Sequence, residues 1–172
     1  MRDCQVPDKD AEQALERMVD EHGARLLRLC YLRLQDRALA EDALQDTFVK
    51  AWRAYPKFRQ DSSEITWLTA IALNCCRSLQ RKAWQRFVDR KTPLEDLPEP
   101  AVPFEPYDDT VTRAVMKLPS RDQEVILMHY YQGLPVKDIA QALSTPLSTV
   151  TTRLIRARNK LKKSLERWYE DE

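Results

Sequence analysis

The sequence contains very little glycine and histidine. Only two of its 172 residues are glycine, Gly23 and Gly133, and only two are histidine. This scarcity argues against glycine-rich phosphate loops, dinucleotide-binding folds and the tight turns of all-β proteins. No apolar run approaches the roughly 18 residues of a membrane-spanning helix, and the N-terminus lacks the apolar segment of a signal peptide. We therefore expect a helical, cytoplasmic protein that does not insert into a membrane.

The sequence also lacks the cysteine and histidine spacings of metal sites and catalytic centres. Its four cysteines, Cys4, Cys30, Cys75 and Cys76, form neither a CxxC pair nor a disulfide framework. Cys30 and Cys75 lie in apolar stretches, where a small buried cysteine is ordinary. The alternative is a metal site that also uses His22. We expect reduced thiols, no metal, no other cofactor and no enzymatic activity.

Charge is distributed unevenly, although the formal net charge is only +1. It is −2 over residues 1–73, +5 over 74–91, −6 over 92–109 and +4 over 110–172. The acidic segment also holds five of the ten prolines, a composition that favours an extended tether over a helix. We expect an all-α protein with two small helical domains, residues 10–91 and 110–168, joined by a Pro-rich acidic linker over 92–109.

Apolar spacing in the first domain predicts three long helices. The first begins after an Asp10 cap, and its buried stripe is expected to contain Leu15, Val19, Leu26, Leu29 and Cys30. The second runs from about residue 38 to 52 and ends before Pro56. The third runs from residue 64 towards 91. Asp61 and Glu64 have the spacing of a capping box, which indicates a defined loop before this third helix.

The outer face of the second helix carries acidic and amide side chains with aromatic edges. The inner stripe is expected to be Ala40, Ala43, Leu44, Thr47 and Ala51, and the outer face Asp42, Gln45, Asp46, Val49 and Arg53, bordered by Phe48 and Trp52. Such a surface repels DNA but suits a protein partner with basic groups. The alternative is an ordinary solvated face with the aromatic rings in the core.

The third helix combines an apolar first half with a basic second half. Its polar and basic residues are Asn74, Arg77, Arg81, Lys82, Arg86, Arg90 and Lys91, and the loop before it contains Phe58, Arg59, Ser62 and Ser63. A basic helix beside a polar loop can hold a single strand with extruded bases. Trp67 suits the core better than a stacking platform, and Asn74 could equally be an ordinary surface residue.

The second domain has the pattern of a helix-turn-helix. Ser120 and Gln123 form a second capping box, and the helix that they open is expected to end near Gly133. A short helix over 136–143 and a break at 144–146 precede a long helix over 148–168. Its buried stripe is expected to be Val150, Leu154, Ala157, Leu161, Leu165 and Trp168.

The opposite face of this long helix mixes hydroxyls, a guanidinium and one isoleucine. It comprises Ser148, Thr152, Ile155 and Asn159, flanked by Thr151 and Arg156, with Arg153, Arg158, Lys160, Lys162 and Lys163 as further cations. Hydroxyls and arginine can contact base edges and phosphates in the major groove, and an aliphatic group can contact a thymine methyl. A basic solvated helix is the alternative.

Three segments together resemble the extracytoplasmic-function (ECF) sigma factors of bacterial RNA polymerase, within the sigma-70 family. The segments are AEDALQDTFVKAW (40–52), FRQDSSEITWLTAIALNCCRSLQRK (58–82) and LPSRDQEVILMHYYQGLPVKDIAQALSTPLSTVTTRLIRAR (118–158). In order, they are similar to the region 2 helix that docks on the polymerase β′ clamp, to the reader of the −10 promoter element, and to region 4. The resemblance covers nearly the whole chain.

The resemblance implies three sets of binding residues. Core polymerase binding is expected at Asp42, Gln45, Asp46, Phe48 and Val49; −10 element binding at Phe58, Ser62, Ser63, Asn74, Arg77 and Arg81; and −35 element binding at Ser148, Thr151, Thr152, Arg153, Ile155 and Arg156. Three departures concern glycines that are usual in the family, replaced here by Gln60, Ser144 and Ser148. Thr151 replaces a common cation, so promoter preference is not expected to follow that of relatives.

We therefore predict a non-enzymatic transcription initiation factor that binds core RNA polymerase and directs it to promoters. The expected partners are the β′ clamp and β flap of the polymerase, promoter DNA, and an anti-sigma factor, which is soluble or holds the protein at the membrane. The alternative is a helix-turn-helix repressor or activator that is not integral to the polymerase and binds palindromic half-sites. The acidic second helix and the separate basic helix argue against that alternative.

Overall fold

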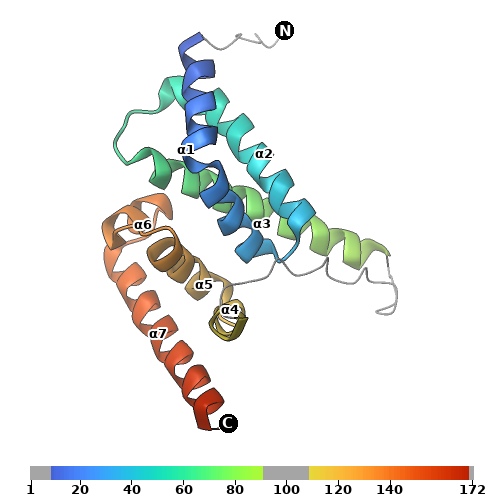
Figure 1. The fold of residues 1–172 in the computed structure, drawn as a ribbon, viewed down its shortest axis with the longest axis vertical. Coiled ribbons are helices and arrows are strands. Elements are labelled where there is room, and N and C mark those ends of the chain that lie inside the picture. Colours follow the sequence, from blue (N-terminus) through green and yellow to red (C-terminus); the bar gives the residue numbers. More distant parts are fainter. Residues whose placement is uncertain (1–8, 91–108, 171–172) are drawn as a thin grey trace. The chain divides into compact units, whose positions relative to one another are not determined.

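The computed structural model describes residues 9–90 and 109–170, with side chains for 9–86 and 110–166 (Figure 1). The chain forms two compact units, residues 1–97 and 98–172. The first contains α1 (Lys9–Leu34), α2 (Arg37–Ala54), η1 (Tyr55–Lys57) and α3 (Glu64–Arg90). The second contains α4 (Asp109–Met116), α5 (Ser120–Ile126), η3 (Leu127–Tyr131), α6 (Val136–Ala142) and α7 (Leu147–Glu170). Every regular element in the described residues is a helix, which confirms the all-α prediction.

The expected linker lies almost entirely outside the described residues. Its last residue, Asp109, is the first residue of α4. Sequence analysis did not predict this helix, because its eight residues are fewer than periodicity needs to stand out. The linker itself therefore stays a prediction.

The first unit is a three-helix bundle whose core is built largely from small side chains. The expected inner stripe of α2 is confirmed, because Ala40, Ala43 and Thr47 are fully buried. Because alanine side chains are small, they let α2 pack closely against both α1 and α3. The core side chains of α1 and α3 can then pack against each other as well. Leu26 and Leu68 are both fully buried in this core.

The beginning of α1 is rotated from the expected orientation. Val19 is 42% exposed, whereas Met18 is 1% exposed. The buried positions of this part are Ala11, Ala14 and Met18, which follow i, i+3, i+7 spacing. The prediction of a buried Val19 was wrong, because the larger Met18 side chain lies one residue away on the face that meets the bundle.

The helix caps in the first unit also differ from the expected ones. Asp10 lies inside α1, which begins at Lys9. The cap of α2 is Asp36, whose carboxylate accepts a hydrogen bond from the Leu39 N–H at 2.8 Å. At the start of α3, the Ser63 hydroxyl accepts from the Thr66 N–H at 3.3 Å. Ser63 therefore caps α3, two residues after the expected Asp61, and the predicted first residue of the helix, Glu64, is correct.

Helix α5 of the second unit begins without a side-chain hydrogen bond from its cap residue, Pro119. The Pro119 carbonyl accepts hydrogen bonds from the N–H groups of Asp122 and Gln123, each at 2.9 Å. Ser120 is the first residue of α5 rather than its cap, and the Gln123 amide donates to Met116 Sδ at 3.1 Å. The cap position is therefore Pro119, one residue before the expected Ser120. The helical path continues through the π-helical turn η3 before the positive φ of 62° at Gly133.

The helix-turn-helix is confirmed in α6, the turn after it, and α7. Ser144 adopts a φ of 48° in this turn, a left-handed conformation that glycine adopts without strain. On α7, Val150, Leu154 and Ala157 are fully buried or nearly so, which confirms the first half of the predicted stripe. Leu161 and Leu165 are half-buried, and the side chain of Trp168 lies outside the described residues.

The cysteines of the first unit are part of its core. Cys30, Cys75 and Cys76 are free thiols with at most 1% exposure. The neighbouring Cys76 side chain and burial both raise the pKa of the Cys30 thiol. In the described residues, no helix combines the length and apolarity that crossing a membrane requires.

Candidate functional surfaces

The outer face of α2 exposes the acidic and amide side chains expected there. Asp42, Gln45 and Asp46 are exposed, and Val49 is 45% exposed beside them. Phe48 is only 8% exposed and belongs to the core. Its ring can therefore support this surface from beneath, whereas the other four side chains can contact a partner directly.

The loop before α3 is held against the helix by an aromatic stack. The rings of Phe58 and Trp67 are stacked with centroids 4.4 Å apart. Between them in sequence, Gln60 has a φ of 56°, a left-handed conformation that glycine adopts without strain. The Ser63 hydroxyl is engaged with Thr66, at 2.7 Å from its Oγ1. Trp67 is half-buried, in keeping with the expectation that it serves the core.

A polar stripe runs along α3 beyond this loop. Asn74, Arg77 and Arg81 follow i, i+3, i+7 spacing and so share one side of the helix. The Arg77 Nη1 donates to the Asn74 Oδ1 at 3.0 Å, which orients the amide so that its NH₂ group faces away from the guanidinium. Asn74 and Arg81 are exposed. The stripe thus offers an oriented amide beside two cations.

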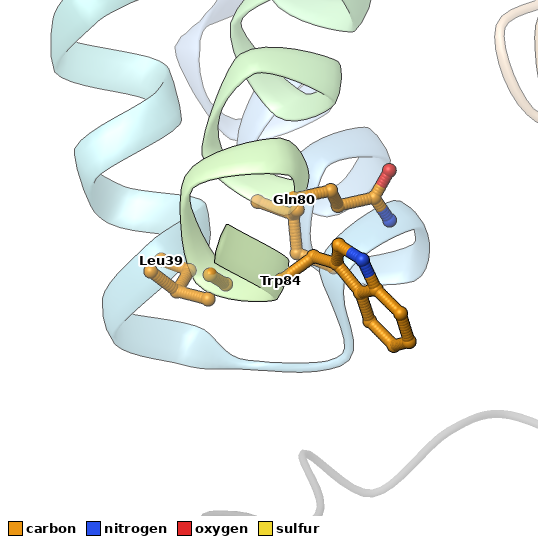
Figure 2. Close-up of a pocket in the computed structure, with 5 residues that line it drawn as sticks. Leu39, Gln80 and Trp84 are labelled. Carbon is orange, nitrogen blue, oxygen red and sulfur yellow. The ribbon is translucent and has the colours of Figure 1, made fainter. Parts of the chain in front are cut away.

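A hollow of about 400 Å³ lies near the end of this stripe (Figure 2). Its lining residues are Leu34, Leu39, Gln80, Ala83 and Trp84. The Trp84 side chain is 67% exposed. Sequence analysis did not single out Trp84, because its spacing alone does not distinguish an exposed tryptophan from a buried one.

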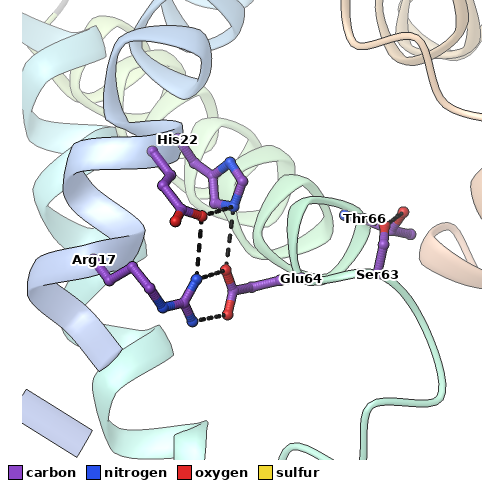
Figure 3. Close-up of polar contacts among 6 residues, drawn as sticks. Arg17, His22, Ser63, Glu64 and Thr66 are labelled. Carbon is purple, nitrogen blue, oxygen red and sulfur yellow. Dashed lines mark hydrogen bonds and ion pairs between the residues drawn. The ribbon is translucent and has the colours of Figure 1, made fainter. Parts of the chain in front are cut away.

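An ion-pair cluster ties the first turn of α3 to α1 (Figure 3). Arg17 donates to both carboxylate oxygens of Glu64, at 2.6 and 2.9 Å, and the His22 Nε2 lies 3.2 Å from Oε2 of the same carboxylate. Arg17 also pairs with Glu21 at 3.2 Å. The Arg17 guanidinium is the main cause of the lowered pKa of Glu64.

This cluster is the described group closest to a metal site in composition. Ligand atoms of Glu21, His22 and Glu64 lie within 4.8 Å of one another. However, both Glu64 oxygens already accept from Arg17, so a metal ion would have to displace a charge-assisted bidentate pair. The arrangement fits an ion-pair network. It contains no cysteine, in contrast to the metal site considered from the sequence.

Five of the six residues expected to contact the −35 element are exposed on α7. Ser148, Thr151, Thr152 and Arg156 are exposed, Ile155 is 51% exposed, and Arg153 is half-buried. The Thr151 and Thr152 hydroxyls donate to backbone carbonyls one turn earlier, at 3.0 and 2.9 Å. Because their protons are used within the helix, their oxygen lone pairs remain to accept hydrogen bonds from base amino groups.

Asp122, which sequence analysis did not single out, forms hydrogen bonds to two cations of α7. Asp122 of α5 is fully buried, and its carboxylate accepts from Arg156 Nε at 3.0 Å and from Lys160 Nζ at 3.1 Å. Hydrogen bonding to Arg156 is the main cause of the lowered pKa of Asp122. A hollow of about 360 Å³ lies alongside, lined by Thr152, Ile155, Arg156, Asn159, Lys160 and Lys163.

Comparisons with known proteins assign both units to one family. Sigma-70 region 2 matches residues 18–86, and Sigma-70, region 4 matches residues 108–161. The RNA polymerase sigma-H factor of Pseudomonas aeruginosa is 28% identical over 90% of this chain and 88% of its own length. The ECF RNA polymerase sigma factor SigM of Mycobacterium tuberculosis is 32% identical over 88% of this chain and 77% of its own.

Solved structures show the same two-unit fold. The sigma factor RpoE of Bartonella quintana, solved with the anti-sigma factor NepR, covers 92% of this chain and 98% of its own at 25% identity and a TM-score of 0.73. CnrH, solved with the cytosolic domain of CnrY, covers 90% and 89% at 27% identity and a TM-score of 0.67. The chain therefore belongs to the ECF RNA polymerase sigma factors, which are transcription initiation factors. This confirms the predicted family and function over the repressor or activator alternative.

Proposed function

We propose that this chain binds core RNA polymerase through the exposed face of α2 and reads promoters with α3 and α7. The observation that carries the proposal is a difference in charge between two faces of the first unit: the outer face of α2 exposes the carboxylates of Asp42 and Asp46, whereas the second half of α3 exposes the cations Arg81, Lys82 and Arg86. DNA is repelled by the former and attracted by the latter. One unit can therefore bind a protein and a nucleic acid on different helices.

The proposed polymerase surface consists of Asp42, Gln45, Asp46 and Val49, with Phe48 beneath it. Its exposed apolar side chain, Val49, lies among polar groups, as at the core of a modest protein interface. The carboxylates favour a basic partner and speed its association. The partner proposed here is the β′ clamp, and region 4 is proposed to meet the β flap.

The proposed −10 surface comprises the loop and the stripe on α3. An amide such as Asn74 can recognise a base edge, because its NH₂ group donates and its oxygen keeps a second lone pair besides the one that accepts from Arg77. Arg77 and Arg81 are proposed to contact phosphates of the same strand. Phe58, Ser62 and Ser63 are proposed to form the pocket wall for an extruded base, with the stacked rings of Phe58 and Trp67 holding the loop in place.

The proposed −35 surface is the exposed face of α7 in the major groove. Ile155 would contact a thymine methyl, and the hydroxyls of Thr151 and Thr152 would accept from base amino groups. Ser148 and Arg153 are proposed to contact phosphates at the edges of the groove. Because the whole chain carries a net charge near +1, we expect weak binding to DNA without polymerase.

An anti-sigma factor is the proposed regulatory partner. The similar sigma factor RpoE was solved with the anti-sigma factor NepR, and CnrH, which has a similar fold, was solved with the cytosolic domain of CnrY. A factor that covers the α2 surface or α7 would prevent binding to polymerase or to the −35 element.

The test is transcription in vitro from a library of genomic fragments, using bacterial core polymerase with and without the protein. Mapped RNA 5′ ends should show discrete starts that depend on the protein and share elements near −35 and −10. If core polymerase stays inactive with the protein but a holoenzyme carrying another sigma factor is modulated, the proposal is wrong and the repressor or activator function is favoured.

The polymerase surface can be tested separately by a charge reversal. Asp46→Lys should weaken binding to core polymerase about tenfold while leaving the melting temperature unchanged, because Asp46 is exposed. Glu16→Lys on α1 makes the same charge change on another exposed position and should bind as wild type does. Equal weakening by both variants would show a general charge effect and contradict the assignment of the surface to α2.

A further inference from the structure

Asp122 contacts Arg156 of α7 through hydrogen bonds to both of its carboxylate oxygens, and not through charge attraction alone. The Asp122 carboxylate accepts hydrogen bonds from both Nε and Nη2 of Arg156, so it is paired with one edge of the guanidinium. Asp122 is fully buried, whereas the Arg156 side chain is 52% exposed. The carboxylate therefore belongs to the interior of the unit, and the guanidinium emerges from it onto the surface proposed for DNA.

A guanidinium held in this way presents its outer edge in a fixed direction. In the part of the chain that the structure describes, the polar contacts of Arg156 involve only Nε and Nη2. The remaining N–H groups, two on Nη1 and one on Nη2, form the outer edge. Two parallel donors of this kind match the O6 and N7 acceptors of guanine in the major groove.

Rigid support matters because arginine loses much rotamer freedom when it binds. A free arginine side chain can reach many groups, so a phosphate and several bases compete for it. Fixing the plane of the guanidinium before DNA arrives reduces the entropy lost on binding and limits contact to a base in one position. Lys160 shares the same carboxylate at 3.1 Å, so its cation is oriented too.

We propose that Asp122 is a positioning residue for promoter recognition, which orients Arg156 to read one guanine of the −35 element. This inference rests on the proposed function and adds a residue that does not itself touch DNA. A purely stabilising role is a weaker account of a buried carboxylate, because an apolar residue of similar size can serve a core equally well. Holding both Nε and Nη2 of Arg156 requires two acceptor oxygens, which a carboxylate has and an amide or an apolar side chain lacks.

The experiment measures initiation by wild type, Asp122→Asn, Arg156→Lys and the double variant with core polymerase. The templates carry every single base-pair substitution in the −35 element, and a second series carries substitutions in the −10 element. Glu166→Gln is the matched control, since it removes one negative charge from α7, where Glu166 pairs with exposed Lys162 at 3.6 Å. Thermal melting of each variant reports stability separately.

We expect one base pair at which wild type prefers guanine by roughly tenfold. Asp122→Asn and Arg156→Lys should each reduce that preference to about twofold, at the same base pair, and the double variant should lose no more than either one. The −10 preferences should not change. If Asp122→Asn keeps the wild-type pattern of −35 preferences, or lowers initiation equally on every template, the inference is wrong.

Two other outcomes also test the inference. If Asp122→Asn fails to fold, Arg156→Lys still decides, because it leaves the buried carboxylate paired with Lys160; an unchanged guanine preference in that variant overturns the inference. If wild type directs no initiation at all, the proposed function fails and this inference fails with it. Normal wild-type initiation with no guanine preference attributable to Arg156 overturns the inference alone.

Discussion

Removing the charge of Glu64 should loosen the junction of α1 and α3. Glu64→Gln keeps the size of the side chain but eliminates the bidentate pair with Arg17 at 2.6 and 2.9 Å. It also removes a carboxylate from the first turn of α3, where negative charge favours the helix by roughly 0.3–1 kcal/mol. The matched control is Glu21→Gln, which alters the same cluster at its exposed edge.

The expected magnitude follows from the exposure of the partners. The Glu64 side chain is 19% exposed and that of Arg17 is 46% exposed, so solvent screens the pair in part. A hydrogen bond to a charged group contributes about 1.5–3 kcal/mol when shielded, and an exposed pair contributes at most about 1 kcal/mol. We therefore expect Glu64→Gln to lower the free energy of unfolding by about 1.5 kcal/mol, and Glu21→Gln by less than about 0.5 kcal/mol.

Scanning calorimetry and urea unfolding measure this difference, with the transition of the first unit followed on its own.

The contribution of Glu64 should also depend on pH. Because Arg17 holds the pKa of folded Glu64 below its ordinary value, the folded state binds fewer protons than the unfolded chain. The contribution of Glu64 is thus complete above the unfolded pKa of about 4.3 and is lost as pH falls through the folded pKa. Unfolding of Glu64→Gln at the wild-type midpoint at pH 7, or a difference that persists unchanged into strong acid, would refute this reasoning.

Three further outcomes are expected. Ser144→Gly should raise the free energy of unfolding of the second unit by about 0.5–1 kcal/mol, because it relieves a φ of 48°; urea midpoints measure this, and a loss of stability would contradict it. Ile155→Ala should weaken −35-dependent initiation with little change in melting temperature, because the side chain is 51% exposed; a large drop in melting temperature would instead show a packing role. A thiol reagent should modify the buried cysteines only at the rate of unfolding, as followed by mass spectrometry; rapid native modification would contradict this for Cys30, Cys75 and Cys76.

Much of this protein could be predicted from local patterns alone. A helix repeats every 3.6 residues, so the spacing of Val150, Leu154 and Ala157 assigned the buried side of α7 and thereby its exposed side. The same logic placed Ala40 and Ala43 inside and the carboxylates of α2 outside. The resemblance to ECF sigma factors then assigned roles to these faces, and the comparisons confirm the family, while the roles of single residues stay proposals.

Tertiary structure decided which residues meet across the chain. Periodicity indicates that one side of a helix is buried, but the neighbours determine its rotation, so Met18 rather than Val19 entered the core. Partners distant in sequence leave no local signal: Arg17 meets Glu64, and Asp122 meets Arg156 34 positions later. The sequence determined which charges the faces carry, whereas the fold determined that Arg156, a cation proposed to contact DNA, is held by the buried carboxylate of Asp122.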